Sequence, residues 1–536
     1  MTANLAELLS AAAAVDGDRV ALVEPATGRR VTWSELDREV CSVATGLDAM
    51  GLVTGYRVVI ALTNRIEFVT TYLGVLRAGL VAVPVNPRSA TGELVRLLAD
   101  SGARALVTDS STLPIARQAV AGLQDALVGA EEELRRRTAV PRVIVVSAPT
   151  LPGETSYAEL TAGRTGEVPG GRDPERLAVL LYTSGTSGRP RAAMLSHRAL
   201  LANIEQAARV QPPMLHGDDV VLGVLPLFHV YGLNAVLGQV IRQRARLVLV
   251  DGFDSEESLR VVETEAVTVL PVAPPVFAHW QGVPHLKARL GRVRLVLSGS
   301  APLSRELVEA FTERTGTEVH QGYGLTEAAP VVTSTLCSRR SAGELVRSGS
   351  VGAALPGIEL RLVDGAGRTP EGGDAGEIQV RGANLFSGYW PDGADGSDSA
   401  GWYATGDVGL LDVEGDLFLF DRLKELVIVS GFNVYPTEVE DVIAEVDGVA
   451  ETAVIGTEHP VTGEAVVAYV KPAPGSAYDA EEIVERVREH CAVRLARFKQ
   501  PTEVHVVTEL PRTVTGKVAK GRLRATRRHG TAGLLE

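Results

Sequence analysis

The chain of 536 residues is poor in cysteine. Cys41, Cys337 and Cys491 are its only three cysteines, and they lie far apart. Because no Cys-x-x-Cys pair occurs, neither a disulfide framework nor a cysteine zinc site underlies the fold. Such sparse cysteine fits a reducing compartment, and we expect a cytoplasmic protein.

Long hydrophobic runs and a basic surface are missing as well. No uncharged apolar stretch reaches the roughly 18 residues that a membrane-spanning helix requires. Residues 1–15 lack the basic start of a secretory signal and include Glu7. A net charge of -13 and a pI near 5.4 argue against nucleic acid as a partner, because a phosphate backbone binds to a basic face. We expect no integral membrane segment and no nucleic-acid ligand.

The first 420 residues alternate short Val/Leu/Ile runs with Ala/Glu/Arg-rich stretches. This rhythm predicts mostly parallel sheets with crossover helices. The predicted strands are 57–62, 81–85, 105–108, 142–146, 220–225, 245–250, 267–271 and 295–298.

A smaller unit begins after Pro436. Its pattern predicts helices from Thr437, over 480–496 and from Lys517, and strands over 452–455, 465–470 and 503–507. The expected fold class is therefore α/β, with a large N-terminal unit of several subdomains and a small α+β C-terminal domain.

Residues 182–191, which we name the phosphate loop, read Tyr-Thr-Ser-Gly-Thr-Ser-Gly-Arg-Pro-Arg. Hydroxyl donors, glycines and arginines suit close contact with a triphosphate. The loop lacks the Gly-Lys-Ser/Thr ending of a Walker loop, and by itself it is equally typical of a solvated linker. A helix is expected over about 196–210. The candidate nucleotide ligands in the loop are Thr183, Ser184, Gly185, Thr186, Ser187, Gly188 and Arg191.

A second motif, Gln-Gly-Tyr-Gly-Leu-Thr-Glu, occupies residues 321–327. Its two glycines are expected to expose the Tyr323 ring for stacking. Thr326 offers a hydroxyl donor to a phosphate, and Glu327 offers a hard oxygen ligand to Mg²⁺. Taken alone, the same string also fits a tight turn with an exposed glutamate.

Four further residues carry chemistry. His229 follows Leu-Pro-Leu-Phe, although a lone histidine beside aromatic residues usually belongs to the core. Asp407 can accept hydrogen bonds from ribose hydroxyls and Arg422 can add donors, although both also fit surface ion pairs. Lys517 in Thr-Gly-Lys would ordinarily be a solvated surface residue.

Together these motifs resemble one family, the adenylate-forming enzymes, which include acyl-CoA synthetases, beetle luciferases and the adenylation domains of peptide synthetases. The resemblance runs almost end to end. It implies ATP, Mg²⁺ and coenzyme A as cofactors and a small carboxylic acid as substrate. It also implies that Lys517 bridges the acid and the phosphate, that Tyr323 packs on adenine, and that Thr326 and Glu327 serve the α-phosphate and magnesium.

The resemblance implies further contacts. Those to the nucleotide are Ser300, Ala301, Pro302, Gly322, Tyr323, Gly324, Thr326, Asp407 and Arg422; those to the acyl group are His229, Val272, Ala273, Gly299 and Gly324; those to CoA are Ser430, Gly431 and Phe432. It also implies that a domain of residues 1–423 and a mobile domain of residues 425–536 rotate about a hinge at Lys424.

One departure from the family occurs in the phosphate loop. The family usually has Pro-Lys-Gly where this chain has Pro190-Arg191-Ala192. If position 192 requires a positive φ, alanine costs about 1 kcal/mol there. Weakened adenylation, or retention of the thioester step alone, is therefore an open alternative.

The expected activity is ligation of an acid to CoA through acyl-AMP. An acyl-AMP ligase that loads a carrier protein, luciferase chemistry and a non-catalytic binding protein stay open beside it. The last is disfavoured because the expected active-site residues are all present. Val272, Ala273 and Val276 favour an apolar or aryl acid without identifying it.

Overall fold

The computed structural model describes residues 3–128, 132, 137–164, 166, 168, 171, 173–183, 190–300, 303, 305–339, 349–370, 374–422, 425–429, 432–459, 462–513 and 517–528. At residues 421, 422, 432, 433, 463, 525 and 526 it describes the backbone alone.

A seven-stranded sheet forms the first layer of the large unit. In spatial order its strands are β7 (Thr155–Ser156), β6 (Arg142–Val146), β5 (Ala105–Asp109), β3 (Arg57–Ala61), β4 (Val81–Pro84), β8 (Leu177–Thr183) and β9 (Arg191–Ser196). All neighbours are parallel except β8 and β9. The helices of this part are α2 (Trp33–Ala49), α3 (Ile66–Arg77), α4 (Thr91–Ser101), α5 (Leu113–Val128) and α7 (Tyr157–Thr161). Strands β4 and β5 are buried along their whole length, as expected for parallel strands covered on both faces.

A nine-stranded sheet forms the second layer. Its order is β16 (Ala353–Ala354), β15 (Val331–Ser334), β14 (Val319–Gly324), β13 (Leu295–Ser298), β12 (Val269–Val272), β10 (Val220–Gly223), β11 (Arg246–Leu249), β1 (Val20–Glu24) and β2 (Arg29–Thr32). The strands from β14 to β1 are parallel, and the outer ones are antiparallel. The helical segments of this part are α1 (Glu7–Asp16), α8 (His197–Ala208), η1 (Tyr231–Gly238), α9 (Gln239–Gln243), α10 (Ser255–Thr264), α11 (Pro275–Trp280), α12 (Leu286–Arg289), α13 (Arg305–Thr315), η2 (Thr326–Ala328) and η3 (Thr335–Cys337).

All eight predicted strands of these two layers are present, so the alternating hydrophobic rhythm identified them correctly. The rhythm did not identify the other strands of these layers, and it also missed an antiparallel four-stranded sheet. It comprises β17 (Ile358–Val363), β18 (Gly376–Gly382), β19 (Tyr403–Leu411) and β20 (Leu417–Arg422). In β18, buried and half-buried positions alternate, the pattern of a sheet with one face on the core.

The C-terminal part forms the α+β unit that the sequence predicts. Its strands are β21 (Val427–Val429), β22 (Phe432–Val434), β23 (Val449–His459), β24 (Gly463–Pro472) and β25 (Glu503–Val506); its helices are α14 (Pro436–Ala444), α15 (Ala480–Arg494), η4 (Arg497–Lys499) and α16 (Lys520–Arg528). The last helix begins at Lys520, so the prediction of a helix from Lys517 was wrong by three residues. Lys517 instead lies in a loop closed by hydrogen bonds between its backbone and Thr513.

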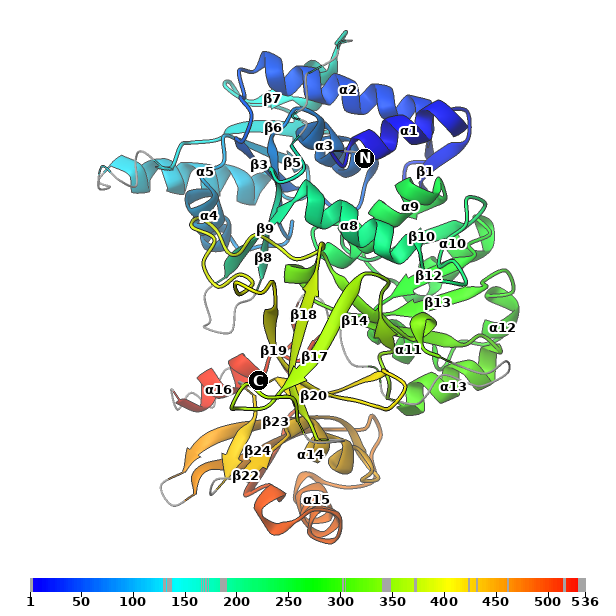
Figure 1. Cartoon of the computed structure of the whole chain (residues 1–536), viewed down its shortest axis with the longest axis vertical. Coiled ribbons are helices and arrows are strands. Elements are labelled where there is room, and N and C mark those ends of the chain that lie inside the picture. Colours follow the sequence, from blue (N-terminus) through cyan, green and yellow to red (C-terminus); the bar gives the residue numbers. More distant parts are fainter. Residues whose placement is uncertain are drawn as a thin grey trace.

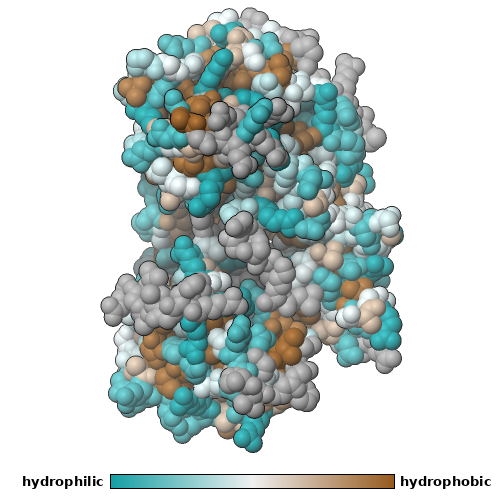
Figure 2. All heavy atoms as spheres, turned by 90° about the vertical axis from the view of Figure 1, so that its left-hand side faces the viewer, coloured by the Kyte–Doolittle hydropathy of each residue, from teal (hydrophilic) through white to brown (hydrophobic). Residues whose placement is uncertain are grey.

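Figure 1 shows the order of these layers along the long axis of the molecule. Helices α1 and α2 lie at one end, the strands and helices of the C-terminal unit lie at the other, and β17–β20 lie between. On the face in Figure 2, hydrophobic residues form small, separate patches among hydrophilic ones. None of the helices within the described ranges has the length and hydrophobicity needed to cross a bilayer.

Candidate active site

Strand β14 ends in the Gly-Tyr-Gly motif. A Cβ atom at Gly322 would lie 2.8 Å from the carbonyl oxygen of Thr333. A Cβ atom at Gly324 would lie 2.3 Å from that of Pro330. Close backbone approach therefore requires both glycines. The expectation that they expose the Tyr323 ring was wrong: Tyr323 is 8% exposed and packs in the main hydrophobic core. Its hydroxyl donates a hydrogen bond to Asp407 Oδ2 at 2.6 Å.

Asp407 and Arg422 are neighbours because of strand register. They face each other across the antiparallel pair β19 and β20. The two predicted ribose contacts thus come from adjacent strands, and Tyr323 from the nine-stranded sheet joins Asp407 beside them.

His229 lies at the start of a π-helix, η1. Its carbonyl accepts a hydrogen bond from Leu233 N at 2.9 Å, and its Nδ1 accepts one from Tyr231 N at 3.3 Å. An acceptor role for Nδ1 leaves the proton of the neutral ring on Nε2. π-Helical turns are rare and frequently occur at functional sites.

The Tyr231 ring lies against Gly299. A Cβ atom at Gly299 would lie 3.0 Å from Tyr231 Cε1 and 3.1 Å from Cζ. Two predicted acyl-binding segments are therefore in contact, with a ring on one and a bare backbone on the other. Ala273 packs against the same main core, whereas Val272 is fully buried in the separate cluster beneath α10–α13.

His229 is neutral at physiological pH. Burial, with a contribution from the positive charge of Lys517, lowers its pKa to about 4. The Lys517 charge acts on His229 although the two residues lie far apart in the chain, so the C-terminal unit brings this exposed lysine near the histidine. The structure thereby unites two of the predicted site residues.

Asn64, which the sequence analysis did not identify, holds the turn that carries His229. Its Nδ2 donates to the carbonyls of Gly223, Leu225 and Val250 at 3.1, 2.9 and 3.2 Å, and its Oδ1 accepts from Leu227 N at 2.9 Å. Asn64 follows β3 of one sheet, and its partners follow strands of the other. A polar residue within three positions of the end of a buried parallel strand is the signal that points to it, because sites in such sheets collect at the carboxyl ends of strands.

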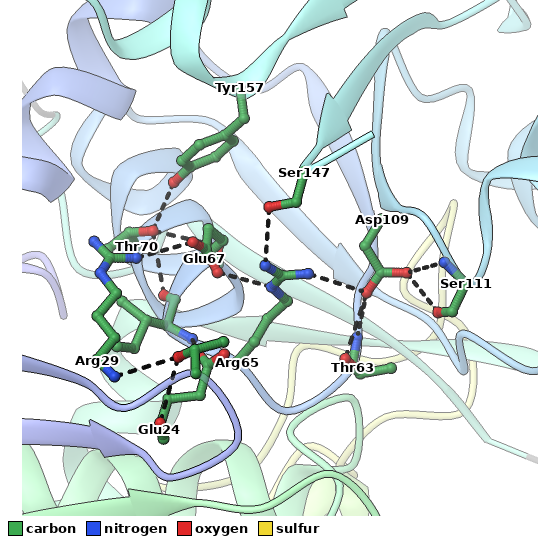
Figure 3. Close-up of polar contacts among 12 residues, drawn as sticks. Glu24, Arg29, Thr63, Arg65, Glu67, Thr70, Asp109, Ser111, Ser147 and Tyr157 are labelled. Carbon is green, nitrogen blue, oxygen red and sulfur yellow. Dashed lines mark hydrogen bonds and ion pairs between the residues drawn. The ribbon is translucent and has the colours of Figure 1, made fainter. Parts of the chain in front are cut away.

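Figure 3 shows how the chain on either side of Asn64 is fixed. Thr63 N and its hydroxyl both lie 3.4 Å from Asp109 Oδ2. Arg65 Nε donates to Glu67 at 2.7 Å, and its Nη1 lies 3.8 Å from the same Asp109 oxygen. These charged neighbours leave the Asn64 backbone little freedom, so its amide is presented to the second sheet in one orientation.

Glu327, the predicted magnesium ligand, is 8% exposed in η2. Its Oε1 accepts a hydrogen bond from the Tyr389 hydroxyl at 2.5 Å, and its carbonyl accepts one from Phe386 N at 2.9 Å. Burial and the Glu327 carboxylate raise the pKa of Tyr389, which therefore stays protonated as the donor. Phe386 packs edge-on against both Tyr389 and Tyr403, with ring centroids 5.1 Å apart in each pair.

Neither Tyr389 nor Phe386 follows a parallel strand. Sequence reasoning missed them because their link to Glu327 arises only when the loop after β18 returns to the core.

Arg191 begins β9. Its Nη2 lies 2.7 Å from Asp395 Oδ2, and its guanidinium carbon lies 3.8 Å from the centroid of the Tyr389 ring. Ala192 is buried within the same strand, where it pairs with Tyr182 and does not adopt a positive φ. The condition under which alanine would be strained at this position is therefore not met.

The residues here fit a magnesium ion that arrives with a nucleotide. Mg²⁺ usually takes one or two carboxylates together with phosphate oxygens and water. Within the described ranges, no group of three or more His, Cys, Asp or Glu side chains could hold a metal ion. A metal ion at this site would therefore need the phosphate oxygens of the nucleotide as further ligands. Glu327, which follows Thr326 in the chain, is the carboxylate that the sequence predicts for this role.

Two more predicted nucleotide contacts, Thr183 and Ser300, lie within the described residues. Thr183 ends β8, where its hydroxyl donates to the Arg191 carbonyl at 3.4 Å, and Ser300 has a positive φ of 74°. Ser184, Gly185, Thr186, Ser187, Gly188, Ala301, Pro302, Lys424, Ser430 and Gly431 lie outside the described residues, and Arg422 and Phe432 are described by backbone alone.

Comparison with known proteins bears directly on this site. The family model described as AMP-binding enzyme matches residues 9–390. The chain belongs to the AMP-binding enzyme family. A second model, the AMP-binding enzyme C-terminal domain, matches residues 438–517 of this family member.

Curated relatives of this AMP-binding enzyme span nearly its full length. It is 31% identical over 518 residues to 4-coumarate–CoA ligase CCL1 of Humulus lupulus, which covers 95% of this chain and 91% of the relative. It is 32% identical over 512 residues to the long-chain-fatty-acid–CoA ligase of Bacillus subtilis strain 168, which covers 92% and 90%.

Solved structures agree with these relatives. ATP-bound MatB from Rhodopseudomonas palustris superposes with a TM-score of 0.86 at 32% identity and covers 98% of this chain and 99% of its own. The anthranilate CoA ligase AuaEII in complex with anthranoyl-AMP gives 0.85 at 26% identity, with 99% and 98% covered. The predicted family and fold class are confirmed, and this AMP-binding enzyme is an acid–thiol ligase of the acyl-CoA synthetase group, whose members use ATP, Mg²⁺ and CoA.

Proposed function

We propose that this enzyme joins an apolar or aryl carboxylic acid to coenzyme A in two steps. First, a carboxylate oxygen attacks the α-phosphorus of ATP, and the bond to pyrophosphate breaks, giving acyl-AMP. Then the CoA sulfur, having lost its proton to water, attacks the acyl carbon, and AMP leaves with the electrons of the broken carbon–oxygen bond.

The observation that carries the proposal is the near full-length match to acid–CoA ligases, one of them solved in complex with anthranoyl-AMP. Attack of a carboxylate on a phosphate brings negative charges together, and a nearby ammonium offsets that repulsion in the transition state. Lys517 is the proposed catalytic cation, and neutral His229 is proposed to border the acid carboxylate.

The other roles follow the positions of the side chains. Tyr323 and Asp407, joined by a hydrogen bond, are proposed to bind the adenosine. Thr326 is proposed to donate to the α-phosphate, and Glu327 to hold the magnesium that accompanies ATP. Magnesium would neutralise charge on the phosphates when bound.

The second step is proposed to follow a rotation of residues 425–536 about Lys424, which withdraws Lys517 and brings Ser430, Gly431 and Phe432 to the site. The two family models leave residues 391–437 between them, and the proposed hinge falls in that interval.

The contact between Tyr231 and Gly299 supports an apolar or aryl acid. Tyr231 contributes an aromatic ring and Gly299 a bare backbone to this region, and Ala273 packs against the same hydrophobic core as Tyr231. Relatives named for 4-coumarate and for long-chain fatty acids point the same way. ATP and CoA as substrates support a cytoplasmic location.

One observation favours a second candidate, an enzyme that retains the thioester step alone. The Arg191 charge is paired with Asp395 and stacked on Tyr389 instead of being held ready for phosphate. A carrier-protein thiol in place of CoA is a further variant of the acceptor.

Mass spectrometry of reactions with ATP, Mg²⁺ and a panel of aliphatic, aryl and polycyclic acids tests the proposal. Each acid is tested with CoA, without CoA, and as synthetic acyl-AMP. Acyl-AMP that converts to acyl-CoA when CoA is added supports both steps. Thioester made only from supplied acyl-AMP would favour the second candidate, and neither product from any acid would refute both.

A further inference from the structure

The phosphate-loop arginine that replaces the family's lysine has two partners in this structure. Its guanidinium lies over the Tyr389 ring, 3.8 Å from the centroid, and pairs with Asp395 at 2.7 Å. The Arg191 side chain is 37% exposed and that of Asp395 is 71% exposed, so the ion pair is largely solvated. The stacking on the ring is the better-shielded contact, and an ammonium makes only its electrostatic part because it lacks the planar group.

Backbone pairing explains why these residues meet. The segment 387–390 runs along the free edge of β9: Ser387 N donates to Met194 O at 2.9 Å, and Trp390 N donates to Ala192 O at 2.9 Å. Tyr389 bridges to Ala193, two residues from Arg191 on the same face of the strand. Such diagonal neighbours lie within reach of a long side chain and a ring.

The far end of the Tyr389 ring reaches Glu327. The hydroxyl donates to Oε1 at 2.5 Å, while Asn384 and Phe386, which precede that segment, donate to the carbonyls of Ala328 and Glu327 at 2.7 and 2.9 Å. Among the described residues, Glu327 Oε2 accepts no hydrogen bond. One carboxylate oxygen is therefore oriented by protein, and the other is left to a cation.

We propose that Arg191 and Tyr389 are positioning residues for Glu327. Arg191 holds the ring in place, and the Tyr389 hydroxyl fixes the carboxylate so that Oε2 serves the magnesium that accompanies ATP. Residues that orient a metal ligand set its affinity for the metal. The inference rests on the proposed function for the metal and its nucleotide, and it assigns Arg191 a role other than direct contact with phosphate.

Calorimetric titration of ATP into the full-length protein, once with Mg²⁺ and once with EDTA, tests the inference. We expect Tyr389→Phe to weaken ATP binding about 10-fold in Mg²⁺, the lower end for loss of a metal-orienting partner. In EDTA the same variant should bind ATP within twofold of wild type. Arg191→Met should behave similarly, and Arg191→Lys should lose less because its charge stays near the ring.

A double variant decides whether Arg191 acts through Tyr389. If it does, adding Arg191→Met to Tyr389→Phe changes Mg²⁺-dependent binding less than twofold further. Asp395→Asn is the matched control: it removes only the solvated charge pair and should change binding less than twofold. Thermal unfolding of every variant checks that each is folded as well as wild type.

Three results would contradict the inference. If Arg191→Met weakens ATP binding 10-fold or more in EDTA, and its effect adds fully to that of Tyr389→Phe, Arg191 contacts the phosphates and the inference is overturned. If wild type binds Mg·ATP and releases pyrophosphate while Tyr389→Phe leaves the metal dependence unchanged, the inference alone fails. A wild type that binds no Mg·ATP overturns the proposed function together with it.

Discussion

Two anchors in this molecule hold functional side chains by different means. Asn64 holds the His229 turn with four hydrogen bonds to backbone and is itself buried. Tyr389 holds Glu327 with one hydroxyl and is itself steadied by the half-exposed Arg191. The first anchor is buried in the core, where every polar group needs a partner, and the second lies at the edge of the seven-stranded sheet, where Arg191 and Tyr389 are only half-buried. Substitutions at the first should therefore cost stability, and those at the second should change binding.

The largest effect is expected at a residue that belongs to neither anchor. Lys517→Ala should slow acyl-AMP formation about 100- to 1000-fold, the range for removing one electrostatic stabiliser of a transition state. Because Lys517 is exposed, the free energy of unfolding should stay unchanged. Pyrophosphate release measures the first step, and thioester formation from supplied acyl-AMP should stay within threefold of wild type. Equal loss of both steps would reject the role assigned to Lys517.

The core anchor is tested next. Asn64→Leu keeps the side-chain volume but leaves three buried carbonyls and the Leu227 N–H without the amide. We expect a loss of about 3 kcal/mol or more in the free energy of unfolding, measured with urea. Asn64→Asp, which keeps the acceptor but places a carboxylate against carbonyls, should be no more stable than the leucine variant. A loss below about 1 kcal/mol would show that the two sheets hold the turn by themselves.

Acid should weaken the core through His197. This residue is 3% exposed, its Nδ1 accepts a hydrogen bond from Leu5 N, and burial, with a smaller effect of Arg176, lowers its pKa to about 4. Below about pH 6.5, His197 binds a proton in the unfolded chain but stays neutral in the folded chain. The free energy of unfolding should therefore fall until about pH 4, where the folded chain also binds the proton, and then level off.

The His197 contribution to that fall should reach about 3 kcal/mol. His197→Gln, which can still accept from Leu5, should reduce the slope of unfolding free energy against pH but not abolish it. Half-buried His229, whose pKa is also lowered to about 4, adds to the same fall. Identical slopes in wild type and variant would contradict the argument.

The smallest effect is expected at Ala192 in β9, the edge strand of the seven-stranded sheet. Ala192→Gly restores the residue that the family usually has, yet Ala192 lies in a regular strand. Glycine should therefore cost about 0.5–1 kcal/mol of stability and give no tighter ATP binding. A gain in ATP affinity would mean that the phosphate loop needs a backbone conformation other than the strand described for Ala192.

The sequence predicted the parallel strands and several site residues for a common physical reason. Buried strands appear as continuous apolar runs, and residues such as Tyr323, Glu327 and Lys517 stand in recognisable motifs. The sequence did not reveal the contacts between motifs. Arg191 meets Tyr389 and Asp395 only because a distant segment adds to the edge of β9, and no local pattern carries that pairing. Asn64 could have been predicted, since it lies three residues after the end of a buried parallel strand.

The contact between Tyr231 and Gly299 has a consequence for how such ligases diversify. A single methyl group at position 299 would have to displace a ring whose nearest carbon is 3.0 Å away. That ring stands on a π-helix, while Glu327 is tied to a different part of the chain. Under the proposed acyl-binding role of Gly299, a change at this one position would alter which acid is accepted while the residues proposed to hold ATP stay the same.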